Sequence, residues 1–127
     1  MKTTRPIFDF TDADGNAPVQ EFIRKLDPKI QHKINQQLEQ LQMIPCNLHP
    51  PHVKAFRLDR YKGLYELRTR INKMIRIIFF LDNEGRIILL HGFIKKRDRS
   101  TEQALAIARA RKLALASDKS AMKLYKN

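Results

Sequence analysis

One arginine stands inside an otherwise apolar run. Arg76 lies within residues 74–81, where every other side chain is hydrophobic. A buried guanidinium needs an anionic partner, or it must point into a cleft that admits a ligand. Two alternatives follow: Arg76 forms an internal ion pair, for instance with Glu66, or Arg76, Arg68 and Glu66 form one polar cluster on the open face of a sheet. In such a cluster two guanidinium groups would hold a phosphate bidentately, and the carboxylate would accept a proton.

A second cationic group is the run of charges at residues 95–99. Lys95, Lys96 and Arg97 lead into a predicted helix, whose N-terminus offers free N–H groups to an anion. The alternative is a solvated loop. Four upstream cations would frame the same cleft: Lys54, Arg57, Arg60 and Lys62. Three aromatic side chains interleave with these charges and would stack on bases: Tyr61, Tyr65 and Phe93. For Phe93, packing in the core is the alternative.

The histidines and the single cysteine offer less chemistry. His91 would exchange a proton as a neutral imidazole in a predicted strand, with a half-buried structural histidine as the alternative. Cys46, His49 and His52 lie close together in sequence. Known zinc patterns need a fourth ligand or an open catalytic position, and the sequence holds no second cluster. We therefore expect no metal ion and no other cofactor.

The net charge points to a polyanion. The chain carries 25 Lys and Arg against 13 Asp and Glu, a net charge of +12. Residues 1–53 hold six basic and six acidic side chains, so the whole excess comes from residues 54–127, with nineteen against seven. A field of this asymmetry attracts nucleic acid, because each phosphate contact releases condensed counterions. The alternative is a charged but inert surface.

The elements that would position these residues follow from periodicity. A strand is expected over residues 5–10, then a turn at 12–16 and a helix over 19–26. Asp27 and Pro28 indicate the start of a second helix, which Pro45 ends. Further strands are expected from residue 53 and over 64–71, 74–81 and 86–94, with a hairpin loop at 82–85. The last helix is expected over residues 102–116, with the capping-box spacing of Ser100 and Gln103 before it.

This order predicts an α+β domain with helices on one face of an antiparallel sheet. We expect one domain over residues 1–116, followed at 117–127 by a basic tail or helix extension. At 127 residues the chain suits a single domain. The N-terminal residues have no apolar run, so no signal peptide is expected, and the longest apolar stretch is too short for a membrane span. A lone cysteine fits a reducing interior, and we expect a cytoplasmic protein.

Three segments, in order, resemble the RelE/HigB superfamily, in particular its phage-derived, HigB-like branch. They are residues 53–68 (VKAFRLDRYKGLYELR), 75–80 (IRIIFF) and 88–96 (ILLHGFIKK). An alanine-rich helix after the third segment is also similar to the family pattern, and the resemblance spans residues 18–112. It implies a RelE-like fold and the toxin of a type II toxin–antitoxin pair, countered by an antitoxin with a helix-turn-helix domain.

The implied activity is metal-independent cleavage of mRNA, usually in the ribosomal A site, which stops translation and growth. The ribose 2′-OH attacks the adjacent phosphorus, leaving a cyclic phosphate and a free 5′-OH. By position, the family's strand arginines are Arg68 and Arg76, which would hold the scissile phosphate. Lys54, Lys95 and Lys96 match its basic positions, and Glu66 or His91 would transfer the proton. Many relatives carry a tyrosine or histidine near the C-terminus, where this chain offers only Tyr125. The alternative is a nucleic-acid-binding module of the same fold without catalysis.

Overall fold

The computed structural model describes residues 5–43, 52–96 and 98–126. Within them three helices, one short 3-10 helix and six strands follow one another. They are β1 (Ile7–Phe10), α1 (Pro18–Arg24), α2 (Pro28–Gln42), β2 (Val53–Ala55), η1 (Asp59–Tyr61), β3 (Leu64–Ile71), β4 (Lys73–Leu81), β5 (Ile87–Ile94), α3 (Asp98–Ser117) and β6 (Met122–Leu124). The predicted α+β class is confirmed.

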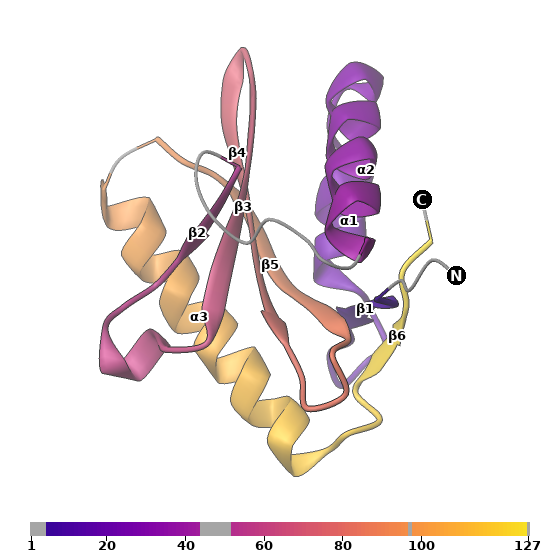
Figure 1. Cartoon of the computed structure of the whole chain (residues 1–127), viewed down its shortest axis with the longest axis vertical. Coiled ribbons are helices and arrows are strands. Elements are labelled where there is room, and N and C mark those ends of the chain that lie inside the picture. Colours follow the sequence, from indigo (N-terminus) through magenta and orange to yellow (C-terminus); the bar gives the residue numbers. More distant parts are fainter. Residues whose placement is uncertain (1–4, 44–51, 97, 127) are drawn as a thin grey trace.

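The strands form one sheet in the order β2-β3-β4-β5-β1-β6 (Figure 1). The predicted meander is present as β3, β4 and β5, with each strand antiparallel to the next. β4 lies inside the sheet, as its apolar sequence predicts. β1 lies parallel to β5, so the sheet is mostly rather than wholly antiparallel.

Helices cover both faces of this sheet, and the expectation of a single covered face is wrong. On one face α1 and α2 pack against Leu67 and Ile77. On the other face α3 packs against Leu64 and Ile78. Neighbouring residues of a strand point to opposite faces, and here both sets are apolar, so each face needs its own cover.

The start of α2 agrees with the sequence-based prediction, and the start of α3 does not. Asp27 caps α2, since its Oδ1 accepts the backbone N–H of Lys29 at 3.0 Å, and Pro28 occupies the first turn. α3 begins at Asp98, so Ser100 lies inside the helix rather than before it. A capping box requires its serine at the position just outside the helix. The predicted capping box is therefore wrong.

The C-terminal segment differs most from expectation. Residues 122–124 are a strand, not a tail or a helix extension, because the chain turns back after α3 and β6 pairs antiparallel with β1. Tyr125 packs against the core and donates its hydroxyl hydrogen to Asn35 Oδ1 at 2.7 Å. The Gln20 side-chain amide donates to the carbonyl of Lys126. These contacts hold the segment on the sheet, with Tyr125 half-buried against the core.

Asp9 of β1 is fully buried beside this strand, with 0% of its surface exposed. Neither carboxyl oxygen has a hydrogen-bond partner among the described residues. Lys123 lies opposite Asp9 across the β1–β6 pair. Burial raises the pKa of Asp9 to about 7, while the charges of Lys123 and Arg24 act to lower it. The Asp9 carboxyl therefore changes its protonation state near neutral pH.

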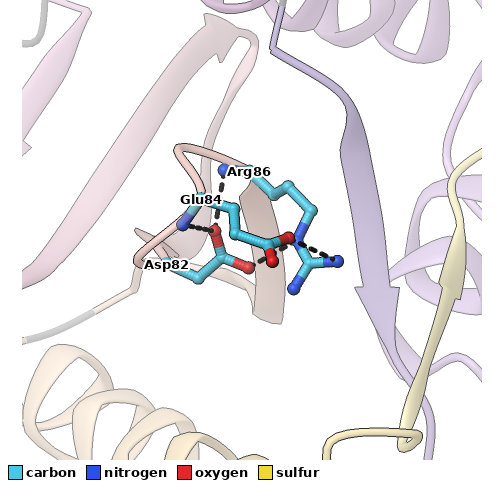
Figure 2. A network of polar contacts seen from close by, with 3 residues as sticks. All are labelled: Asp82, Glu84 and Arg86. Carbon is cyan, nitrogen blue, oxygen red and sulfur yellow. Dashed lines mark hydrogen bonds and ion pairs between the residues drawn. The ribbon is translucent and has the colours of Figure 1, made fainter.

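The loop between β4 and β5 is the hairpin expected at residues 82–85. Asp82 Oδ1 accepts the backbone N–H groups of Glu84 at 3.0 Å and Arg86 at 2.9 Å. Arg86 Nε donates to Asp82 Oδ2 at 2.6 Å, and Arg86 Nη1 lies 3.2 Å from Glu84 Oε2 (Figure 2). Gly85 takes a φ of 77°, which glycine adopts at no steric cost. This network pairs Arg86 with both acidic side chains of the loop.

Candidate functional site

The register of β3 and β4 brings the two candidate arginines face to face. Arg68 is directly opposite Arg76, and Glu66 is opposite Ile78. Residues opposite each other share a face of the sheet, as do residues two apart along a strand. Glu66, Arg68 and Arg76 therefore lie on the face that carries α3. Like charges directly opposite repel, so this arrangement requires a counter-ion.

Glu66 is that counter-ion. Its Oε1 accepts a hydrogen bond from Arg68 Nε at 3.2 Å and lies 3.6 Å from Arg76 Nε. The Glu66 side chain is 3% exposed and that of Arg76 8%, whereas that of Arg68 is 30% exposed. The internal ion pair is thus present. The three side chains also form one polar cluster, but it lies on the face that carries α3 rather than on an open face, and only Arg68 is partly exposed.

Two buried atoms of this cluster lack hydrogen bonds. Within the described part of the chain, Arg76 Nε and Glu66 Oε2 have no hydrogen-bond partner, although Arg76 Nε is ion-paired with Glu66 Oε1. An unpaired buried polar group costs about 1–3 kcal/mol and calls for an explanation. Burial lowers the pKa of Arg76 below its usual value and Arg68 and Arg70 add to the shift, while Glu66 opposes it. A bound anion would relieve the repulsion among these guanidinium groups.

β5 adds His91 and Phe93 beside the cluster. Phe93 is opposite Arg76, and the His91 ring stacks on Phe93 with 6.0 Å between ring centroids. Arg111 of α3 places Nη1 3.0 Å from His91 Nδ1. A guanidinium only donates, so Nδ1 accepts and the ring proton sits on Nε2. Burial, and then the charge of Arg111, lower the pKa of His91 to about 4, so the imidazole is neutral at physiological pH.

This geometry predicts the titration of His91. The folded-state pKa of about 4 lies below the usual histidine pKa of 6.5. His91 therefore stabilises the fold above pH 6.5, and that contribution is lost as the pH falls through 4. In ¹H–¹⁵N spectra we expect an Nε2–H tautomer and a midpoint near pH 4. Arg111→Met should raise the midpoint, whereas Arg109→Met, on the exposed side of α3, should not. A wild-type midpoint at 6.5 would contradict this structure of the site.

The remaining candidates differ in where they lie. Lys54 is opposite Glu66 on β2, with its Nζ 5.7 Å from the Phe56 ring. Lys95 continues the β4–β5 ladder, its N–H donating to the Met74 carbonyl at 2.8 Å, and Lys96 is exposed. Arg57 is exposed beyond the Leu64 end of β3, away from Arg68. Arg97 lies outside the described residues. The structure thus brings Lys54 to the cluster and leaves Arg57 apart from it.

Two of the three aromatic candidates belong to the core. Tyr65 lies on the opposite face of the sheet and stacks on Phe79 with ring centroids 5.5 Å apart. Tyr61 is 6% exposed and packs under α3. Phe93 is half-buried on the face of the cluster. Base stacking at this site is therefore ruled out for Tyr61 and Tyr65 and remains a prediction for Phe93.

Two further arginines lie beside the candidate residues, Arg70 on the face of Arg68 and Arg111 beside His91. Arg70 is exposed and shares the face of Arg68, a placement that strand alternation already indicates. Arg111 falls on the same side of α3 as the buried Ala104 and Ala108, and an arginine on such a stripe needs a partner. That position was the available signal, but nothing in the sequence identified His91 as the partner.

The described residues contain neither a cluster of metal ligands nor a membrane-spanning helix. No group of three or more His, Cys, Asp or Glu side chains that could hold a metal occurs in residues 5–43, 52–96 and 98–126. Cys46 and His49 of the sequence motif lie outside these ranges, and His52 is exposed. None of the described helices is long and apolar enough to cross a membrane.

Comparison with known proteins places the chain in a family. No curated protein matches its sequence. A family model does match, that of the phage-derived Gp49-like proteins (DUF891), over residues 21–113. The matched region runs from α1 into the second half of α3 and contains every residue of the Glu66, Arg68 and Arg76 cluster. The chain therefore belongs to the family of phage-derived Gp49-like proteins, which is part of the toxin–antitoxin-related RelE/HigB-like group.

Proposed function

We propose that this chain is the toxin of a type II toxin–antitoxin pair, an endoribonuclease of the HigB-like branch that cuts mRNA on the ribosome without a metal ion. One observation carries the proposal: Arg68 and Arg76 face each other across β3 and β4 around a single buried carboxylate. Membership of a toxin-like family supports the toxin–antitoxin context. The protein would act in the cytoplasm and be held inactive by a helix-turn-helix antitoxin.

The two arginines would bind the scissile phosphate. A guanidinium presents several N–H donors in a plane and pairs bidentately with phosphate oxygens. During cleavage the phosphorus becomes five-coordinate and gathers negative charge. Fixed cations beside that charge stabilise the transition state because they need no reorganisation. Arg76, held in place by burial, would act as the fixed donor, and the more exposed Arg68 would close on the phosphate.

Glu66 would accept the proton in this reaction. The O2′–H bond breaks and its proton passes to Glu66, O2′ bonds to phosphorus, and the P–O5′ bond breaks as O5′ leaves and takes a proton from solvent water. Glu66 Oε2 has no hydrogen-bond partner among the described residues and would be the oxygen that takes this proton. His91 is the other candidate, yet its Nδ1 accepts from Arg111 and its Nε2 already carries hydrogen. His91 would therefore donate a hydrogen bond through Nε2–H.

The other cations would hold the RNA on either side of the cut. Lys54 lies at the Glu66 end of the cluster, and Lys95 and Lys96 follow the end of β5. Together with Arg57 and Arg97, they would bind the phosphate backbone in a salt-dependent manner. Phe93 would stack on a base beside the scissile phosphate.

One observation favours a second candidate, a nucleic-acid-binding module without catalysis. Glu66 is almost fully buried and engages both arginines through one oxygen, Oε1. A carboxylate that merely neutralises two arginines would have the same environment. In that case the basic face would bind RNA and leave it intact.

Induced expression of the wild-type chain separates the two functions. A toxin should arrest growth, and primer extension on a cellular mRNA should show discrete cuts. Purified protein that has been treated with EDTA and then desalted should still cut mRNA when it is added to a translating extract. Folded wild-type protein that binds RNA but causes neither arrest nor cuts would overturn the proposed cleavage and leave the binding module.

A further inference from the structure

A second surface feature lies toward the other end of α3. A cavity of about 440 Å³ opens between the β4–β5 loop, η1 and the C-terminal half of α3. Its apolar lining comes from the sheet, from α3 and from the start of β6: Leu64, Phe80, Ile88, Leu113, Leu115 and Met122. On β3, Leu64 is four residues from Arg68, and each strand residue adds about 3.3 Å. The cavity is therefore separate from the arginine cluster.

The rim of the cavity is cationic. Arg60, Lys62, Arg109, Lys112 and Lys119 all line it. The two acidic side chains of the rim, Asp82 and Glu84, are both paired with Arg86 (Figure 2). Arg60 has only a long and exposed ion pair with Glu102, at 3.7 Å. Among the described residues the other four rim cations have no acidic partner within 4 Å. The rim therefore keeps an uncompensated positive charge.

The outer face of α3 continues this surface with aliphatic side chains. Leu113, on the edge of the cavity, is 53% exposed, and Ile107 is 40% exposed. With the exposed Ala106, Ala110 and Ala114 they occupy one side of the helix at intervals of three and four residues. The opposite side of α3 is buried against the sheet. A helix that is apolar on both sides normally has a partner on each.

We propose that this cavity and the outer face of α3 bind an acidic amphipathic segment of a partner protein. Carboxylates of the segment would meet Arg109, Lys112 and Lys119, and its aliphatic side chains would cover Leu113 and enter the cavity. Under the proposed function that partner is the antitoxin, and only this identification rests on the proposed function. The binding surface itself is inferred from charge and exposed apolar area.

Other occupants fit this surface less well. RNA would use the cations but not the exposed leucine and isoleucine, and Phe80 of the lining is already covered by Lys112, whose Nζ is 5.1 Å from the ring centroid. A second copy of the chain would place the same cations against each other in a symmetric contact, which is repulsive. A protein segment with negative charge and aliphatic anchors satisfies both features.

Fluorescence anisotropy with two synthetic peptides tests the inference on the full chain. Both peptides are glutamate-rich, of equal length and equal charge; one carries leucine at i, i+3, i+4 and i+7, and the other serine. We expect the leucine peptide to bind at least about tenfold more tightly, the effect of burying one or two leucine side chains. Leu113→Ser should reduce its affinity about tenfold. Leu58→Ser, at a leucine that is 61% exposed and outside the cavity, should not.

Charge reversal localises the contact. Arg109→Glu with Lys112→Glu should lower the affinity for the leucine peptide by more than about tenfold. Lys95→Glu with Lys96→Glu should change that affinity little. Equal binding of both peptides, or equal losses from the two reversals, would overturn the inference. If the affinity for a labelled RNA falls more with the Arg109 and Lys112 reversal than with the Lys95 and Lys96 reversal, the surface binds RNA instead. Because these readouts need no cleavage, a chain that cuts no RNA can still bind the peptide, and the two proposals can fail separately.

Discussion

Arg76→Ala should abolish growth arrest and lower the rate of mRNA cleavage about 10²–10³-fold, the loss seen when one preorganised donor to a developing oxyanion is removed. Arg76 is the buried member of the facing pair, so no neighbour takes its place. Arg76→Lys should recover little of the rate, because an ammonium keeps the charge but not the planar fork of donors. Primer extension and a translating extract measure both variants.

The matched control is Lys33→Ala, which removes one positive charge from an exposed position on α2, outside the cluster. Its cleavage should match wild type. Removing one partner of a buried ion pair destabilises a protein by about 3–5 kcal/mol, so thermal unfolding must accompany each assay. Should Arg76→Ala fail to fold, Arg76→Gln combined with Glu66→Gln removes both charges and still tests catalysis. A folded variant without Arg76 that cuts at the wild-type rate would exclude this cluster as the cleavage site.

Asp9→Asn should stabilise the protein at pH 8 and have a smaller benefit at pH 5. The pKa of Asp9 is raised from 3.8 to about 7 in the folded state. Below pH 3.8 the carboxyl is protonated in both states and costs nothing. Between 3.8 and 7 only the folded state keeps the proton, so stability falls as the pH rises, and above 7 the full cost, about 4 kcal/mol, persists.

Urea unfolding at pH 5 and pH 8 measures this effect as a difference between variant and wild type. The advantage of Asp9→Asn should grow by about 2–3 kcal/mol between the two pH values. Taking the difference removes the contribution of His91, whose lowered pKa acts in the opposite direction. Asp14→Asn, at an exposed loop position, serves as the control and should show no such growth. A constant difference for Asp9→Asn would mean that Asp9 does not titrate near neutral pH.

Much of the central sheet and the arginine cluster is predictable from local pattern. In β3, polar Glu66 and Arg68 alternate with the buried Leu67 and Thr69, and this period of two defines both faces. The expected strands at 64–71 and 74–81 leave only a two-residue connection, and in the structure the chain turns between β3 and β4 at Asn72, whose φ is 58°. Once two strands form a hairpin, the register follows, and it places Arg68 opposite Arg76. The cluster was therefore foreseeable from neighbouring residues.

Features that depend on distant partners were not foreseeable. β6 has three residues, and Leu124 within it is 53% exposed; pairing with β1, not hydrophobic periodicity, makes it a strand. The contact between Arg111 and His91 crosses from α3 to β5 and sets the tautomer of the imidazole. Likewise, no local pattern states which face of the sheet a helix will cover.

The neighbouring positions of β1 and β6 have a consequence for biosynthesis. β1 is made first among the described elements and β6 last, yet Phe8 and Phe10 pair with Leu124 and Met122. While the chain is still being translated, the backbone N–H and C=O groups on the outer edge of β1 remain unpaired, because β6 has not yet been made. An unpaired strand edge of this kind is open to association with other chains. The sheet is thus completed only after translation has passed residue 124, and an incomplete chain ending before that point would expose the β1 edge.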